Sequence, residues 1–202
     1  MTKIKLTNPE RYWLAVRADM PWLRDPDVED LRQRWSDRDE RDWTSIVAAV
    51  EHVMDEIAGG RGRIELDDEE DPEVGEHVVV DADLDHLAVE DRKIVSGWFH
   101  AHTGPVADPW GDSLVNGRHR LWSSWQAVPD AVLPVYSAQL LWLGSIPHME
   151  DDFAAGVYQR TMEGIELISP TVLERNPSFC AELRRVAGLG VPGQDVGSSV
   201  AC

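Results

Sequence analysis

The clearest hydrophobic pattern in the chain is an amphipathic stripe in its N-terminal third. Apolar residues recur at helical spacing from residue 43 to residue 57, and Gly59-Gly60 ends the run. The positions that form the stripe are Ile46, Val47, Val50, Val53, Met54 and Ile57. This stripe predicts a helix that buries one face and ends at the paired glycines.

The residues before this stripe also carry helix signals. Asn8-Pro9 and Asp25-Pro26 each combine a capping side chain with a proline at the first helical position. We therefore interpret residues 8–58 as helical and expect residues 1–60 to form a helical N-terminal module. Three tryptophans fall on its shorter helices: Trp13, Trp22 and Trp35. Such aromatic residues mostly pack in a core, and the alternative is a docking surface for a protein partner.

The middle of the chain alternates between strand and helix patterns. The expected elements are a strand at 78–80, a helix at 84–100, a strand at 113–115, a helix at 118–127 and a strand at 132–137. This order predicts an α+β protein with an α/β alternation in its middle.

Helical patterns return toward the C-terminus. Residues 149–167 and 170–186 predict helices, and Asn176-Pro177 interrupts the second. We expect these helices, within residues 145–187, to pack on the core. Residues 188–202 are rich in Gly, Ser and Val and are expected to be disordered.

The net charge of the chain limits the classes of binding partner that we expect. The chain of 202 residues has 37 acidic and 19 basic side chains, which gives a formal net charge of −18. Such a field repels nucleic-acid phosphates, and the basic clusters are small, so we do not expect nucleic-acid binding. The acidic run from Glu65 to Glu73 is interpreted as a solvated loop.

Cysteine usage and hydropathy point to the compartment. Two cysteines, Cys180 and Cys202, provide neither a disulfide framework nor a metal-binding pattern. The sequence shows no secretory signal pattern and no apolar run of membrane-spanning length. We therefore expect a cytoplasmic protein that has no membrane partner.

Residues 113–122 carry the strongest chemical signal. The expected strand ends at Asn116-Gly117, a sharp turn, and the next apolar positions fall at helical spacing. The turn delivers Arg118, His119 and Arg120 to a helix start, where free backbone N–H groups and the helix dipole favour an anion. Two guanidinium groups and an imidazole there predict a phosphate or carboxylate site. The alternative is a solvated basic helix start.

The Asn-Gly-x-His-Arg sequence at 116–120 resembles the ParB/sulfiredoxin-like superfamily. Residues 117–120 are similar to the Gly-Cys-His-Arg loop of sulfiredoxins, residues 132–135 are similar to the strand that closes the fold, and the likeness covers residues 76–140. It implies a small β-sheet core and a loop that holds nucleotide phosphates. The residues that would hold them are Asn116, Gly117, Arg118, His119 and Arg120. Because Arg118 stands where sulfiredoxins keep their reactive cysteine, sulfinic acid reductase activity is not expected.

Four residues are candidates for catalysis in a nucleotide-dependent phosphotransferase. Such an enzyme needs a base and charge neutralisation, often from Mg²⁺ that accompanies a nucleoside triphosphate. Asp81, Asp83 and Glu90 lie near the end of the first strand of the core, and His119 lies in the loop itself. Asp112, just before the second strand, is a candidate metal ligand. For any single carboxylate, the alternative is a surface residue in an acidic protein.

A second motif lies at Gly97-Trp98-Phe99-His100-Ala101-His102. It is similar to the Gly-Trp-Tyr-His-Ser-His strand of JAMM-type metalloproteases, and this likeness makes His100 and His102 candidate ligands of Zn²⁺. That family continues with serine and aspartate at fixed positions, where this chain has Trp110 and Ser113. The segment also fits a helix end, from which His102 would line a nucleotide cleft or cap the helix.

The sequence therefore supports one main functional hypothesis and two alternatives. In the first, the loop at 116–120 binds a nucleotide or a phosphorylated small molecule, as a small-molecule phosphotransferase or a nucleotide-dependent switch. The first alternative is a non-catalytic regulatory protein that binds a protein partner through its Trp-rich helices. The second is a JAMM-like zinc hydrolase.

Overall fold

The protein is an α+β protein with small antiparallel sheets and surrounding helices. The computed structural model describes residues 1–29, 35–65, 77–100, 102–144 and 150–186. The strands are β1 (Thr2–Thr7), β2 (Tyr12–Ala15), β3 (Arg63–Glu65), β4 (His77–Ala82) and β5 (Leu133–Tyr136). The helices are α1 (Pro26–Glu29), α2 (Trp43–Ala58), α3 (Val89–Trp98), α4 (Arg118–Ala127), α5 (Ala138–Gly144), α6 (Asp151–Leu167), α7 (Pro170–Arg175) and α8 (Pro177–Val186). Short 3-10 helices are η1 (Pro9–Arg11), η2 (Arg17–Asp19) and η4 (Arg38–Glu40).

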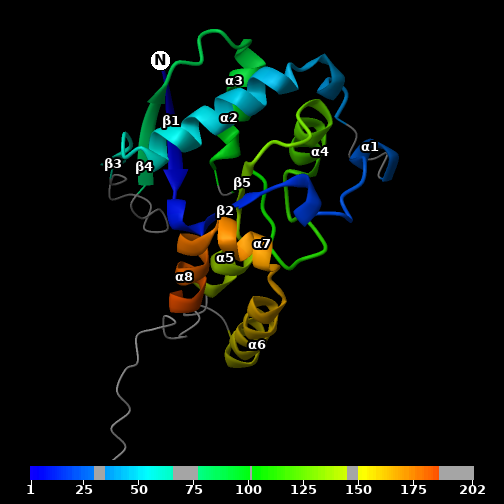
Figure 1. The fold of residues 1–202 in the computed structure, drawn as a ribbon, viewed down its shortest axis with the longest axis vertical. Coiled ribbons are helices and arrows are strands. Elements are labelled where there is room, and N and C mark those ends of the chain that lie inside the picture. The colour runs from blue at the N-terminus through cyan, green and yellow to red at the C-terminus, as the bar shows by residue number, and fades with distance from the viewer. Residues whose placement is uncertain (30–34, 66–76, 101, 145–149, 187–202) are drawn as a thin grey trace, which may run out of the picture.

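The predicted helix after residue 43 is confirmed as α2. Asp42 caps it, because its Oδ1 accepts the N–H of Ser45 at 3.1 Å. The predicted stripe faces inward, and the helix packs against α3, α4 and both sheets. Figure 1 shows α2 and α3 at one end of the molecule, α5 to α8 gathered at the other, and β2 and β5 between them.

The first sheet has the order β1-β4-β3, with every pairing antiparallel. The central strand, β4, confirms and extends the strand predicted at 78–80. Its partner β1 lies outside the predicted elements, although Lys3-Ile4-Lys5-Leu6 alternates between polar and apolar residues. Ile4 and Leu6 are fully buried, so the alternation places one face of β1 in the core.

The second sheet pairs β2 with β5, and it overturns the prediction that residues 8–58 are helical throughout. Asn8-Pro9 begins only the single turn η1, and the chain then enters β2. Trp13 lies on this strand, is 0% exposed and donates its indole N–H to the Ala107 carbonyl at 3.1 Å. Packing with a distant strand therefore outweighs the local helix signal here.

The strand predicted at 113–115 does not form. Val115 is 66% exposed, and pairing in this region is limited to an isolated bridge between Asn116 and Val106. As a result, β4 and β5 lie in different sheets, and the predicted α/β alternation does not build one sheet. The preceding helix, α3, is also shorter than the predicted 84–100.

The C-terminal helices follow the prediction closely. α6 confirms the helix at 149–167, and the interruption at Asn176-Pro177 divides α7 from α8 as expected. Asn176 also completes the open edge of β2: its side chain accepts the Leu14 N–H at 2.6 Å and donates to the Leu14 carbonyl at 3.0 Å. The acidic run after Glu65 and the tail at 188–202, for which we predicted a loop and disorder, lie outside the described residues.

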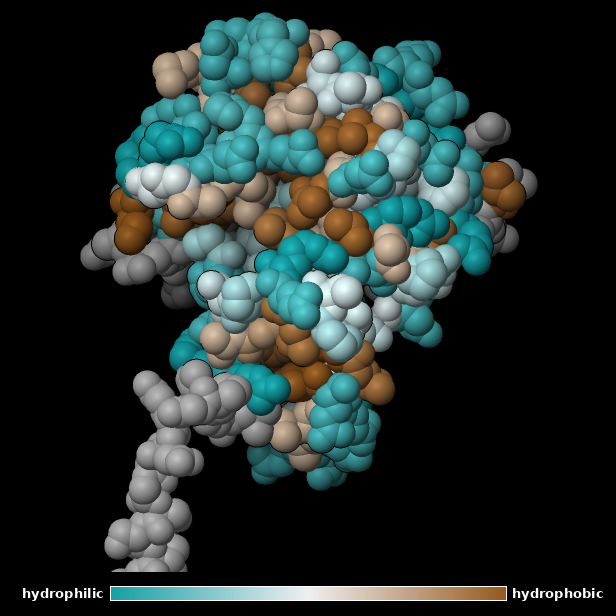
Figure 2. Space-filling view, viewed as in Figure 1, coloured by the Kyte–Doolittle hydropathy of each residue, from teal (hydrophilic) through white to brown (hydrophobic). Residues whose placement is uncertain are grey.

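The surface is mixed in character. In Figure 2 hydrophobic patches are interrupted by hydrophilic residues, and one patch lies on the lower part of the molecule, where α6 is found. The exposed hydrophobic residues of α5 and α6 are Trp142, Phe153, Tyr158, Met162 and Leu167. Among the described helices, none combines the length and the hydropathy needed to span a membrane.

Candidate functional site

The loop before α4 has the geometry that the sequence predicts for residues 116 to 120. Gly117 has a φ of 83°, in the left-handed region, and serves as the N-cap of α4. A Cβ at this position would lie 2.8 Å from the Cβ of Pro105 and closer still to its backbone. Asn116 ties the turn down, because its Nδ2 donates to the His102 carbonyl at 3.0 Å and its Oδ1 accepts the Gly117 N–H at 2.8 Å. Glycine is therefore required at the N-cap position of α4.

A pocket of about 700 Å³ opens at the start of α4. Its lining residues are Trp35, His102, Thr103, Leu114, Val115, Asn116, Gly117, Arg118, His119 and Arg120. The N-cap Gly117 has no side chain to cap the helix, so the positive end of the α4 dipole lies at the wall of the pocket without a side-chain cap. All five residues predicted to bind phosphate thus line one pocket.

Arg120 lines this pocket without a hydrogen-bond or ion-pair partner among the described residues. Its Nε is buried without a hydrogen-bond partner, and its guanidinium makes neither a hydrogen bond nor an ion pair with any described residue. Burial lowers the pKa of Arg120. The guanidinium lies beside the backbone of Gly97, where a Cβ would be 3.7 Å from Nη2.

Comparison with other arginines shows why this matters. Arg11 and Arg41 also have a buried Nε without a partner. However, Arg11 donates through Nη1 to the Tyr136 hydroxyl at 3.4 Å, and Arg41 forms ion pairs with Asp37 and Asp91. Arg120 has no such compensation within the described part of the chain, and an anion in the pocket would provide it.

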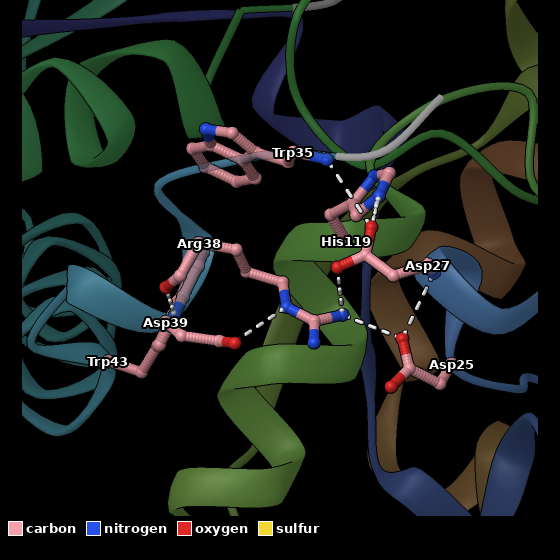
Figure 3. Close-up of polar contacts among 7 residues, drawn as sticks. All are labelled: Asp25, Asp27, Trp35, Arg38, Asp39, Trp43 and His119. Carbon is pink, nitrogen blue, oxygen red and sulfur yellow. Dashed lines mark hydrogen bonds and ion pairs between the residues drawn. The ribbon is translucent and has the colours of Figure 1, made fainter. Parts of the chain in front are cut away.

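His119 is held by a carboxylate from the N-terminal part of the chain. Its Nε2 lies 3.0 Å from Oδ1 of Asp27, a residue 92 positions earlier (Figure 3). The side chain of Asp27 is only 10% exposed. The Oδ1 of Asp27 also accepts the backbone N–H of Trp35 at 3.3 Å, and the Oδ2 of Asp27 pairs with Nη1 of Arg38 at 3.1 Å. Three donors therefore satisfy this carboxylate and fix its position.

Arg38 is the centre of the surrounding network. Besides Asp27, it pairs with Asp25 at 2.6 Å and with Asp39 at 3.1 Å, as Figure 3 shows. The hydrogen bond from Arg38 lowers the pKa of Asp25. The indole N–H of Trp43 donates to the Arg38 carbonyl at 2.8 Å. This network links residues 25–27 to residues 35–39 beside α4.

Trp35 forms the aromatic wall of the pocket. Its ring is nearly perpendicular to the rings of His119 and Trp43, with centroids 6.1 and 5.6 Å away. These edge-to-face contacts hold the ring against the imidazole. Of the three tryptophans that the sequence places in the N-terminal region, Trp13 is fully buried in the core, and Trp22 and Trp35 are partly buried and pack against it.

The carboxylates proposed for catalysis lie elsewhere. Asp81 is on β4, where it forms an ion pair with Arg63, and Asp83 follows that strand on the surface. Glu90 is on α3 and pairs with Lys93 at 2.8 Å. These three side chains do not line the pocket, whereas the fourth catalytic candidate, His119, does.

The candidate metal ligands do not form a group of three or more. The rings of His100 and His102 have centroids 5.6 Å apart, and His100 Nδ1 accepts the backbone N–H of His102 at 3.3 Å. Asp112 is exposed on the loop that leads to the pocket. Within the described ranges, no group of three or more His, Cys, Asp or Glu side chains is placed to hold a metal ion. His102 instead lines the pocket, as the helix-end interpretation predicts.

Sequence reasoning missed Asp27, Arg38 and the role of Trp35 in this site. The signal at Asp25-Pro26 was available, but it predicted only a helix start. The short α1 that begins there packs against α4 and brings Asp27 to the imidazole.

Comparison of the chain with protein-family models, with curated proteins and with solved structures found no match. The resemblance to the ParB/sulfiredoxin-like superfamily therefore stays a prediction that rests on the loop at 116–120. The function must be argued from the pocket itself.

Proposed function

We propose that the protein binds a nucleotide or a phosphorylated small molecule in the pocket at the start of α4. The observation that carries this proposal is the partly buried guanidinium of Arg120, whose Nε is buried without a hydrogen-bond partner and which has no anionic partner among the described residues. An uncompensated buried cation is costly, and a bound anion removes that cost. In a chain with 37 acidic and 19 basic residues, internal carboxylates are abundant, so a missing partner favours an external one.

Phosphate fits the remaining donors well. The positive end of the α4 dipole favours an anion, and an arginine can donate two parallel hydrogen bonds to a phosphate. Arg118 lines the same pocket and adds positive charge. A phosphate group offers more acceptor oxygens than a carboxylate, and therefore matches several converging donors better.

The other wall of the pocket favours a ligand larger than phosphate alone. Trp35, Leu114 and Val115 provide apolar surface beside the cationic residues. A volume of about 700 Å³ is in the range of ordinary small-molecule sites, roughly 300–1,000 Å³. A nucleoside or another organic group attached to the phosphate would fill this part of the pocket.

The family resemblance supports the same ligand class. In the ParB/sulfiredoxin-like superfamily the corresponding loop holds nucleotide phosphates, and residues 116–120 line the pocket here. A phosphotransferase and a nucleotide-dependent switch both follow from such binding. Mg²⁺ would enter with the nucleotide, because the candidate carboxylates at Asp81, Asp83, Glu90 and Asp112 are not among the residues that line the pocket.

The test is ligand-induced stabilisation. Thermal unfolding is measured in buffer free of phosphate and sulfate, with inorganic phosphate, ATP, CTP or GTP, each with and without Mg²⁺. At 100 times the dissociation constant a ligand adds about 2.7 kcal/mol, which raises Tm by roughly 5–10 °C for a chain of this size. Arg120→Gln should abolish the shift, whereas Arg92→Gln, which alters a surface ion pair on α3, should retain it. No shift with any of these ligands would contradict the proposal.

A second candidate function is protein–protein interaction through α5 and α6. Trp142 is 44% exposed and Phe153 is 49% exposed, and both line a pocket of about 390 Å³. Large exposed apolar side chains of this kind are typical of interaction surfaces. Trp142→Ser combined with Phe153→Ser should lower any self-association that sedimentation velocity detects, and a wild-type chain that is monomeric at all concentrations would count against a homotypic interface.

A further inference from the structure

We propose that His119 is the general base of the pocket and that Asp27 is its positioning residue, in the transfer of a phosphoryl group from a nucleoside triphosphate to water. This inference rests on the proposed nucleotide binding and adds a reaction to it. It is carried by the carboxylate–imidazole contact, which ordinary binding of an anion does not require.

The contact fixes which imidazole nitrogen can accept a proton. Asp27 Oδ1 is an acceptor 3.0 Å from His119 Nε2, so Nε2 carries the proton in the neutral ring. The lone pair is then on Nδ1. Nδ1 makes no hydrogen bond with any described residue and is not shielded from solvent. Since His119 lines the pocket, this acceptor is available to a water molecule bound there.

The carboxylate is itself held rigidly. Besides the imidazole, the carboxylate of Asp27 contacts the backbone N–H of Trp35 and the guanidinium of Arg38. The side chain of Asp27 is 10% exposed. The perpendicular contact between the rings of Trp35 and His119 restrains the imidazole further. Such a supported pair of base and orienting carboxylate is the arrangement that general-base catalysis uses.

The proposed step balances as follows. A water oxygen bonds to the terminal phosphorus, and its proton moves to His119 Nδ1. The bond between that phosphorus and the bridging anhydride oxygen breaks, and both electrons leave on the bridging oxygen. The nucleoside diphosphate needs no proton to depart, and the imidazolium releases its proton to solvent. Arg118, Arg120 and the start of α4 would neutralise the charge on the transferred group.

The test measures phosphate release from ATP, CTP and GTP with Mg²⁺ and, separately, nucleotide binding by calorimetry. His119→Asn should lower kcat by about 10²–10⁴-fold with KM changed little, as loss of a general base does. Asp27→Asn should lower kcat by at least about tenfold, the usual scale for partners that orient a functional imidazole. Asp85→Asn is the matched control: it removes a carboxylate that is 65% exposed and pairs with Arg92, away from the pocket, and it should leave kcat unchanged.

A second measurement separates positioning from mere structural support. ¹⁵N NMR of the imidazole at neutral pH should find His119 protonated at Nε2 in the wild-type protein and shifted toward protonation at Nδ1 in Asp27→Asn. Binding without any phosphate release would overturn the proposed reaction and leave the proposed function intact. Release that is unchanged in His119→Asn, or an imidazole tautomer that is the same in both proteins, would also overturn it. An Asp27→Asn protein whose thermal unfolding matches the wild type excludes misfolding as the cause of a lower kcat.

Discussion

Replacement of Arg120 by methionine should make the ligand-free protein more stable while it abolishes anion binding. Most substitutions of partly buried residues destabilise a protein, so the sign of this prediction is diagnostic. It follows from the buried Nε, which has no hydrogen-bond partner, and from the absence of an ion pair to any described residue. Methionine retains an unbranched apolar stem and removes the group that burial penalises.

The size of the effect can be worked from the unpaired group. A buried polar group without a partner costs about 1–3 kcal/mol, and more when it is charged. The ligand-free Arg120→Met protein should therefore gain about 1–3 kcal/mol in its free energy of unfolding. For a chain of this length each kcal/mol raises Tm by roughly 2–4 °C.

The assay is urea unfolding in buffer free of phosphate and sulfate, followed by thermal unfolding with and without nucleotide. Arg92→Met is the control, because Arg92 forms an exposed pair with Asp85 at 3.4 Å and contributes at most about 1 kcal/mol. A loss of stability in ligand-free Arg120→Met would refute the account of its burial. A gain in stability with an unchanged nucleotide shift would refute its role in binding.

Three further predictions concern the frame of the site and its dependence on pH. Gly117→Ala should lower Tm and weaken nucleotide binding measured by calorimetry, because φ is 83° and the new Cβ would overlap the neighbouring loop. Asn176→Ala should lower the free energy of unfolding in urea by about 1–3 kcal/mol, because it leaves both backbone polar groups of Leu14 without this partner. Asp25 has a lowered pKa through its hydrogen bond to Arg38, so its contribution to stability is present above its unfolded pKa and is lost as pH falls through the lowered value. Asp25→Asn should therefore flatten the acidic limb of a plot of Tm against pH, and an unchanged limb would contradict this assignment.

Local patterns predicted the helices of this protein better than its strands. The stripe from residue 43 to residue 57 contains enough turns to specify a helix without distant partners. The Asn176-Pro177 pair likewise marks a helix boundary from local sequence alone. β2 contains only four residues and follows a helix start at Asn8-Pro9, so its identity depends on β5, more than 100 positions away. The apolar run at 113–115 failed for the opposite reason, because no described strand extends alongside it and Val115 remains exposed.

The candidate site also combines local features, which the sequence predicted, with long-range features, which it did not. The turn at Gly117 and the delivery of two arginines and a histidine to a helix start are local features, and the sequence predicted them. The partner of His119 is a long-range feature, since Asp27 reaches it across 92 positions through the packing of α1 on α4. In a chain with 37 acidic residues, no local rule distinguishes this carboxylate from those at Asp81 or Glu90, which lie on the surface.

Hydrogen-bond satisfaction separates the structural polar groups of this protein from the one for which we propose a function. Asn176 is 5% exposed and uses both ends of its amide on backbone groups, so it is fully explained by the fold. Asp27 is equally well satisfied, by three donors, and its role follows from the group that it orients. Arg120 differs from both, because its Nε is buried and its guanidinium has no partner among the described residues. Folding alone gives no reason to keep such a group, whereas an anionic ligand does, and the same guanidinium therefore links the stability of the free protein to the affinity of the pocket.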